Sequence, residues 1–216
     1  MNPQGKGIRS IQKVRLMHAA VRYHVQKSGQ WNNDWGLPIN QEDMLGTNLA
    51  FSFVILRGLR QIGCSLYFEE ARAFMHLWNV IGAMLGIREE LLPADEKDAM
   101  GMANYIMSLR FRPSEAGREL TKALLGCLEA VPPYSTVKGF ATTYMRYLVG
   151  DEVANILGLP PSNWSKTLIT GIRAANAVRS MASHVPDEHT ESLFDQMIKN
   201  KQKTSFEIPL NMRGAQ

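Results

Sequence analysis

The apolar residues of this chain recur at the three- and four-residue spacing of an α-helix from one end to the other. No run shows the two-residue alternation of a half-buried strand, and no Asn-Gly pair marks a hairpin. The 216 residues contain no linker-like or repeated stretch and are enough for one sizeable core. The pattern predicts an all-α fold: one helical domain of about eight helices over 10–200, an N-terminal extension over 1–9 and a tail over 201–216.

Proline, glycine and capping residues divide this pattern into separate helices. Asn40 is a preferred N-cap residue, and Asp43 places a negative charge in the first turn, where the helix dipole favours it. Gly63 and Gly86 each follow a periodic segment and are expected to end a helix. The breaks predict helices over 10–27, 40–62, 67–85, 94–110, 114–130, 135–150, 151–157 and 162–183, and a last one after Pro186 up to residue 199.

One histidine lies between two arginines on a single face of the first expected helix. At about 100° per residue, Arg15, His18 and Arg22 fall within roughly 60° of arc, beside an apolar stripe. Two nearby positive charges disfavour imidazolium, so we expect His18 to be neutral and able to coordinate a metal. The arginines can then pair with anions such as the carboxylates of a haem. The alternative is a hydrogen-bonded core histidine, because a helix produces this short spacing easily.

This motif is the first of four sequence blocks that occur together. The blocks are RLMHAAVR at 15–22, WGLPINQEDMLGTNLAFSFVILRGLR at 35–60, FMHLWNVIGAMLGI at 74–87 and LLP at 91–93. In this order they resemble the MpaB/rubber-oxygenase family, whose members include latex-clearing proteins. The resemblance runs from about residue 9 to about residue 180, so it covers most of the chain.

The resemblance implies a globin-like helical protein that binds a b-type haem. It assigns His18 as the proximal iron ligand, and Arg15 and Arg22 as the arginines of the same motif. It also implies an oxygenase that uses dioxygen to cleave an apolar alkene or isoprenoid chain. Only about fourteen residues precede Arg15, too few for the helices that form the distal side of the haem in this family. The alternative is a non-catalytic haem-binding or structural domain, or one that needs a partner chain.

Two other features are candidates for a role at such a site. His76, within the expected 67–85 helix, fits either a distal haem residue or a partner of a haem carboxylate. A bond to a backbone carbonyl or a buried carboxylate is the alternative that we favour. Trp31 and Trp35 share a short loop, which predicts either a plug on the core or a wall over a cofactor face.

Composition narrows the remaining classes. The net charge of +4 comes without a dense Lys/Arg run, which disfavours nucleic-acid binding. Cys64 and Cys127 are far apart and are expected to be free thiols in a reducing compartment. The longest apolar stretch, 49–56, is too short to span a bilayer, and the N-terminus lacks a signal-peptide core. We therefore expect a cytoplasmic protein without a transmembrane segment, and leave open peripheral membrane contact and a homo-oligomer.

Overall fold

The structure is a computed structural model that describes residues 5–130, 139–161 and 166–182. Within these ranges the chain forms nine α-helices and two 3-10 turns, and no strand, as the all-α prediction expects. The elements are α1 (Lys6–Lys27), η1 (Asn33–Trp35), α2 (Gln41–Phe51), α3 (Phe53–Gln61), α4 (Phe68–Leu85), η2 (Glu89–Leu91), α5 (Glu96–Arg110), α6 (Glu115–Glu129), α7 (Phe140–Val149), α8 (Asp151–Ile156) and α9 (Lys166–Ala182).

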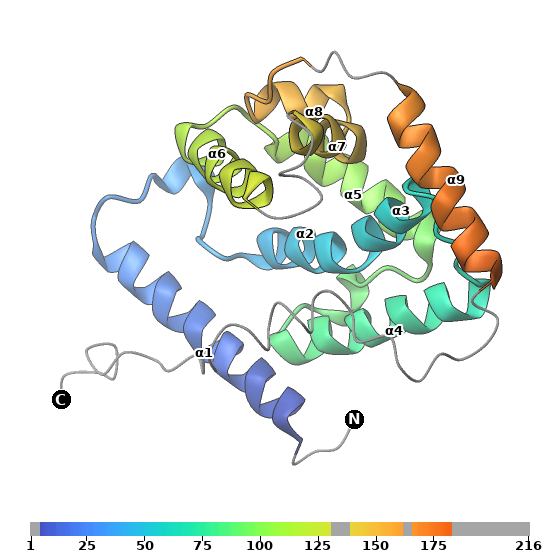
Figure 1. Ribbon diagram of the computed structural model, residues 1–216. Coiled ribbons are helices and arrows are strands. Elements are labelled where there is room, and N and C mark those ends of the chain that lie inside the picture. The colour runs from blue at the N-terminus through green and yellow to red at the C-terminus, as the bar shows by residue number, and fades with distance from the viewer. Residues whose placement is uncertain (1–4, 131–138, 162–165, 183–216) are drawn as a thin grey trace.

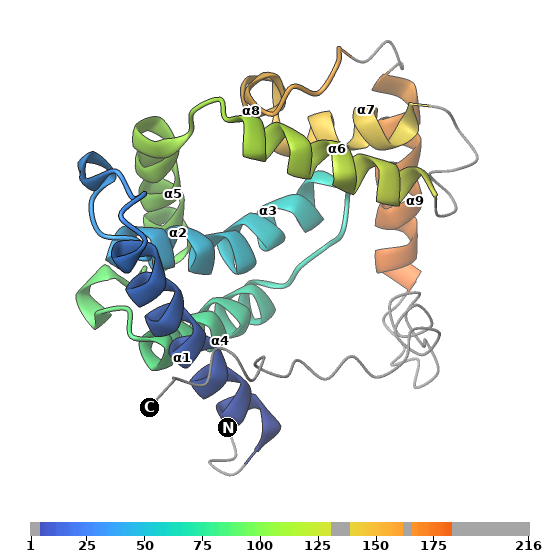
Figure 2. The same cartoon turned by 90° about the vertical axis from the view of Figure 1, so that its left-hand side faces the viewer.

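The helices form layers on either side of α2 and α3. In Figures 1 and 2, α4 lies on one side of this central pair and the α6–α8 group lies on the other. Helix α1 packs against α4, and α2 packs against both α4 and α5. The main core forms where α2, α3, α4 and α5 meet, and its buried members are Leu45, Leu49, Phe53, Leu56, Ala71, Met75 and Ala99. The pocket considered below lies beside this core.

The expected 40–62 helix is broken in two at Ser52. The backbone of Ser52 leaves the helical region, with φ −107° and ψ −89°, and its side chain is fully buried. Its hydroxyl donates a hydrogen bond of 2.7 Å to the carbonyl of Asn48, one turn earlier. A serine that bonds back to the preceding turn bends a helix, which hydrophobic periodicity alone cannot reveal. The prediction of one continuous helix here was wrong.

The ends of several helices agree with the capping residues in the sequence. Asn40 accepts from the backbone of Glu42 and Asp43, while Asp43 accepts from the backbone of Asn40 in return. Gly86 adopts the left-handed conformation that ends α4, with φ 102°. Gly63 has a φ of 88°, a conformation that favours glycine. A side chain there would also clash, because its Cβ would lie 2.5 Å from the carbonyl oxygen of Arg173 in α9. The glycine therefore both ends α3 and lets α9 approach it.

Other boundaries differ by a few residues or lie outside the described ranges. Helix α1 begins at Lys6, earlier than the expected start at Ser10. Gly150 is the N-cap of α8, so Asp151 is its first residue and not its cap. The expected start of the 135–150 helix, the start of the 162–183 helix, the 186–199 helix and the 201–216 tail fall outside the described residues. Cys64 and Cys127 are free thiols, as expected.

Candidate functional site

His18 lies on the inner side of α1, half-buried, at the wall of a cavity of about 490 Å³. Helices α1, α2 and α4 and the loop before α2 enclose this cavity, which we call the His18 pocket. Its volume is within the range of about 300–1,000 Å³ that is usual for small-molecule and cofactor sites. Its lining residues are Ser10, Ile11, Val14, His18, Ile39, Asp43, Met44, Thr47, Asn48, Phe51, Trp78, Ile81 and Leu85.

The surroundings of His18 favour the neutral form of its imidazole. Burial is the main cause that lowers its pKa below the ordinary value of 6.5, and the positive charge of Arg22 lowers it further. The direction agrees with the sequence-based expectation, although Arg15 makes no contribution to the shift. The ring nitrogen Nδ1 is buried and has no hydrogen-bond partner among the described residues. A buried nitrogen in this condition is unlike the hydrogen-bonded core histidine that was the alternative interpretation.

The two motif arginines contact backbone carbonyls, and their expected pairing with the carboxylates of a haem stays a prediction. Arg22 donates from Nε to the carbonyl of Pro38 at 3.1 Å and from Nη2 to that of Ile39 at 2.5 Å. Arg15 makes a longer contact of 3.5 Å with the carbonyl of Met84, at the end of α4. A cation at that position also complements the negative end of the helix dipole. The arginines thus hold α1 against its two neighbours, and each guanidinium keeps further donors.

The walls of the His18 pocket are largely apolar. Trp78 of α4 stacks on Phe51 of α2, with ring centroids 5.4 Å apart and an interplanar angle of 13°. Asn48 is the buried polar residue of this wall: it is 3% exposed, and neither carboxamide atom has a hydrogen-bond partner among the residues that the structure describes. Asn48 was not among the residues expected from the sequence. The feature that could have revealed it is a single amide side chain, next to Leu45 and Leu49, on a helix face that is otherwise apolar.

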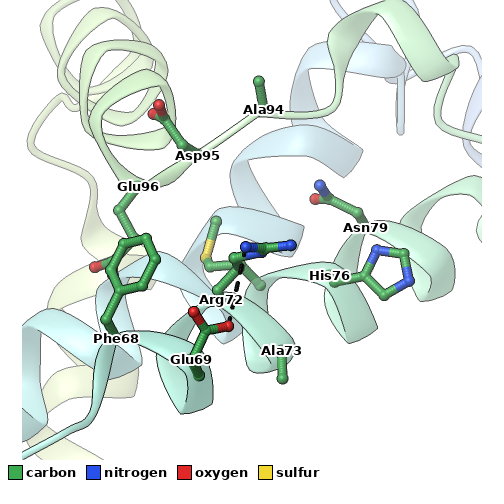
Figure 3. Close-up of a pocket in the computed structure, with 10 residues that line it drawn as sticks. Phe68, Glu69, Arg72, Ala73, His76, Asn79, Ala94, Asp95 and Glu96 are labelled. Carbon is green, nitrogen blue, oxygen red and sulfur yellow. Dashed lines mark ion pairs between the residues drawn. The ribbon is translucent and has the colours of Figure 1, made fainter.

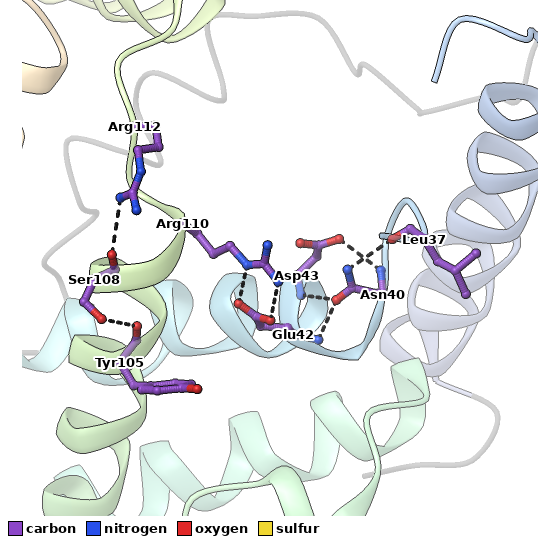
Figure 4. A network of polar contacts seen from close by, with 8 residues as sticks. All are labelled: Leu37, Asn40, Glu42, Asp43, Tyr105, Ser108, Arg110 and Arg112. Carbon is purple, nitrogen blue, oxygen red and sulfur yellow. Dashed lines mark hydrogen bonds and ion pairs between the residues drawn. The ribbon is translucent and has the colours of Figure 1, made fainter. Parts of the chain in front are cut away.

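The start of α2, which forms one side of this pocket, is fixed by polar contacts. Figure 4 shows Arg110 of α5 paired with Glu42, beside the capping contacts of Asn40 and Asp43. The two bonds from Arg110 to Glu42 measure 2.6 and 2.8 Å and share the planar fork of the guanidinium. The hydrogen bond from Arg110 lowers the pKa of the Glu42 carboxyl. These contacts tie the first turn of α2 to α5 and to the loop before α2.

His76 does not lie in the His18 pocket. It is exposed on α4 and lines a second cavity of about 520 Å³ between the starts of α4 and α5, together with Glu69, Arg72, Asn79 and Asp95 (Figure 3). No hydrogen bond to a backbone carbonyl or a carboxylate is found for His76 within the described residues, which leaves our favoured interpretation without support. We call this second cavity the His76 pocket.

The tryptophan loop contributes little to the His18 pocket. Trp31 and Trp35 meet edge to face with ring centroids 5.3 Å apart, and the indole of Trp31 donates 2.8 Å to the carbonyl of Gly36. Trp35 is 60% exposed, so it is not a plug on the core. Neither indole lines the His18 pocket, and Ile39 is the part of this loop that does.

Within residues 5–130, 139–161 and 166–182, no group of three or more His, Cys, Asp or Glu side chains is placed to hold a metal ion between them. None of the helices in those ranges has the length and apolar content needed to cross a bilayer.

Comparison with known proteins identifies relatives of the whole arrangement. Residues 2–181 match the family described as "ER-bound oxygenase mpaB/B'/Rubber oxygenase, catalytic domain". A rubber oxygenase from Streptomyces sp. (strain K30) is 29% identical over 160 residues, which are 73% of this chain and 39% of that protein. The solved structure of latex clearing protein LCP in the closed state superposes with a TM-score of 0.74 at 27% identity, covering 86% of this chain and 51% of that one. The chain thus spans about two fifths to one half of these relatives.

Proposed function

The chain belongs to the MpaB/rubber-oxygenase catalytic-domain family, and from this premise we propose that it binds a b-type haem and takes part in oxidative cleavage of an isoprenoid or alkene chain. His18 is the iron ligand in this proposal. The observation that carries it is the half-buried imidazole of His18 at the wall of a largely apolar cavity, where burial and Arg22 lower its pKa and no described residue bonds its Nδ1. A neutral imidazole is the form that coordinates a metal.

The residues of the pocket fit such a group. The flat apolar walls, with Phe51 stacked on Trp78, suit a planar macrocycle, and the half-buried His18 projects from a helix that two neighbours hold in place. Arg22 fixes the distance between α1 and the Pro38–Ile39 backbone, so it positions His18. A bound haem would supply the activation of dioxygen. The protein would bind and orient the substrate and would exclude water from the pocket.

A second apolar cavity offers room for a long apolar substrate. It has a volume of about 590 Å³ and lies between α3, α5, α7 and α8. Phe51 of the His18 pocket and Val54 of this second cavity follow one another along the α2–α3 pair, and both are about half exposed. An isoprenoid chain has no polar groups to satisfy, so continuous apolar walls are enough to hold it.

A non-catalytic haem-binding role, or one that needs a partner chain, is the second candidate. The match extends over 39% of the Streptomyces relative and 51% of the LCP chain, so it does not by itself transfer the activity of those whole proteins to this chain. Haem binding and oxygenase activity therefore need separate tests.

The first test is an absorption titration with haemin. We expect the protein to give a Soret band, and His18→Ala to lose it or shift it markedly. His24→Ala is the matched control, because His24 is exposed on the same helix and should leave the spectrum unchanged. Equal spectra for the protein and His18→Ala would exclude His18 as the ligand.

The second test separates the oxygenase from the non-catalytic candidate. The haem-loaded protein is incubated with a polyisoprene or a short isoprenoid alkene under dioxygen, and carbonyl products are measured against an anaerobic control. Oxygen-dependent products support the oxygenase. A normal haem spectrum without such products supports the non-catalytic role.

A further inference from the structure

Four buried side-chain polar atoms lack a hydrogen-bond partner in the described part of the chain. They are Nδ1 of His18, Nδ2 and Oδ1 of Asn48, and Oδ1 of Asn79. Asn79 donates from Nδ2 to the carbonyl of Pro93 at 2.8 Å. This bond distinguishes the nitrogen of the carboxamide from its oxygen, so the unpaired atom is the oxygen. Buried polar groups are nearly always paired in native proteins, so four unpaired atoms in one region require a physical explanation.

Asn48 faces both the His18 pocket and helix α4. On one side it lines the His18 pocket, and on the other it packs against α4, where a Cβ on Gly82 would lie 3.2 Å from its Oδ1. Asn79 is three residues before Gly82 on α4, close to one helical turn, and Figure 3 shows it on that helix. The absence of a side chain at Gly82 leaves the carboxamide of Asn48 its space. At the contact between α2 and α4, Asn48 is therefore the residue that can reach both His18 and Asn79.

The unpaired atoms become two donors and two acceptors once a metal is bound to His18. Because Nδ1 is the buried nitrogen, Nε2 is left for the metal, and the ring proton is then confined to Nδ1. His18 Nδ1–H and Asn48 Nδ2–H are the donors, and the oxygens of Asn48 and Asn79 are the acceptors. A metal-bound histidine almost always donates its other N–H to an acceptor, and that bond fixes the orientation of the ring.

We propose that Asn48 is a positioning residue, whose Oδ1 accepts from Nδ1 of His18 and whose Nδ2 donates to Asn79, directly or through one ordered water at each step. This relay rests on the proposed ligation of haem by His18. The terminal torsions of imidazole and carboxamide groups are broad, so modest rotations of the side chains can close the contacts. The relay ends at the carbonyl of Pro93, which anchors Asn79 to the segment before α5.

Three other polar residues of the pocket are rival acceptors for His18. Ser10 is exposed, and its hydroxyl donates 3.0 Å to the carbonyl of Lys6. Asp43 is exposed, and its Oδ2 already accepts from the backbone of Asn40. Thr47 is also exposed, and its hydroxyl donates 2.9 Å to the carbonyl of Asp43. Asn48 is preferred because it is buried and both its carboxamide atoms are unpaired.

The test measures haemin dissociation rate, reduction potential and the iron–histidine stretch by resonance Raman. Asn48→Leu, which keeps the approximate volume, should weaken haem retention roughly 10- to 100-fold, the usual effect of removing such a partner. It should also raise the potential, since the imidazole becomes a weaker donor to iron. Asn79→Leu should shift the same quantities less, and the double variant should match Asn48→Leu, because the relay acts as one unit. Thr121→Val, at a buried threonine of α6 that does not line the His18 pocket, should change none of them.

Asn48→Asp separates the two halves of the relay, since a carboxylate keeps the acceptor towards His18 and loses the donor towards Asn79. It should restore the haem retention lost in Asn48→Leu. If Asn48→Leu retains the potential and the stretch of the unaltered protein while His18→Ala loses the Soret band, the relay is wrong and the haem ligand is right. Shifts with Asp43→Asn alone would identify Asp43 as the acceptor and also overturn the relay.

The cofactor-free protein provides the last control. Asn48→Leu should melt at the same or a higher temperature than the unaltered protein, because the unpaired amide stabilises nothing without a bound metal. A lower melting temperature, with unchanged potential in the haem-loaded form, would mean that Asn48 only binds an internal water. That result would contradict the relay. If no variant and no unaltered protein binds haemin, the proposed function itself fails.

Discussion

Helix α4 separates two cavities of similar volume, about 490 and 520 Å³, and each has a histidine in its wall. On a helical projection, Trp78, Ile81 and Leu85 of the His18 pocket lie roughly opposite His76 and Arg72 of the His76 pocket. His18 is half-buried and has a lowered pKa, whereas His76 is exposed. Burial, more than the presence of a histidine, therefore distinguishes a candidate ligand site from a surface cavity.

A large side chain placed in each pocket is expected to have the largest effect on haemin binding, and it tests the difference between the two pockets most directly. Val14→Trp places a large ring in the His18 pocket, and we expect it to abolish haemin binding by occupying the space. Ala73→Trp does the same in the His76 pocket and should leave haemin binding unchanged. Absorption titration of both variants checks this, with circular dichroism to confirm that each is folded. Loss of binding in Ala73→Trp alone would reverse the assignment of the two pockets.

The two pockets also differ in how their arginines are used. Arg22 donates two hydrogen bonds to the carbonyls of Pro38 and Ile39. Arg72 has an ion pair of 3.9 Å with Glu69, and the side chains of Arg72 and Glu69 are more than 70% exposed. We expect Arg22→Ala to lower the free energy of unfolding by about 1–3 kcal/mol. Arg72→Ala should change it by less than about 0.5 kcal/mol. Urea unfolding measures both, and equal losses would show that Arg22 does not anchor α1.

Two helical glycines, one beside Asn48 and one in open space, sharpen the comparison. A Cβ on Gly101, in α5, meets no atom within 4 Å, so Gly101→Ala should stabilise the helix by up to about 1 kcal/mol. A Cβ on Gly82 would lie 3.0 Å from Leu92 and 3.2 Å from Asn48. The crowding should offset the gain, so Gly82→Ala should be neutral or destabilising. Thermal unfolding of the pair decides the point, and an equal gain at both positions would show that Asn48 has room to spare.

The smallest expected effect concerns the carboxylates beside the pockets. Hydrogen bonds from Arg110 and Arg60 lower the pKa values of Glu42 and Glu96. Each group is ionised more readily in the folded state, so its stabilisation is present above the ordinary pKa and is lost as the pH falls through the lowered one. Both pairs are partly exposed to solvent, so we expect less than about 1 kcal/mol from each. Glu42→Gln and Glu96→Gln should each flatten the acid limb of a stability–pH curve slightly.

The sequence predicted the fold better than the details of the site. Capping at Asn40 and termination at Gly86 are local effects, so single residues reveal them. The break at Ser52 and the bonds of Arg22 to Pro38 and Ile39 depend on backbone positions that hydrophobic periodicity does not encode. Asn48 was missed for a similar reason, because its importance comes from having no partner in three dimensions. The assignment of His18 as haem ligand remains a prediction.

The bend at Ser52 has a mechanical consequence. One straight helix from the His18 pocket to Gln61 would transmit any displacement of its first turns to its far end. At that end, α7 and α9 bond to the carbonyls of Gln61 and Ile62. The break at Ser52 divides this span into α2 and α3, which separates the pocket end from the α3 end. A guest molecule can therefore push the α2 wall outward while the α3 end keeps its contacts.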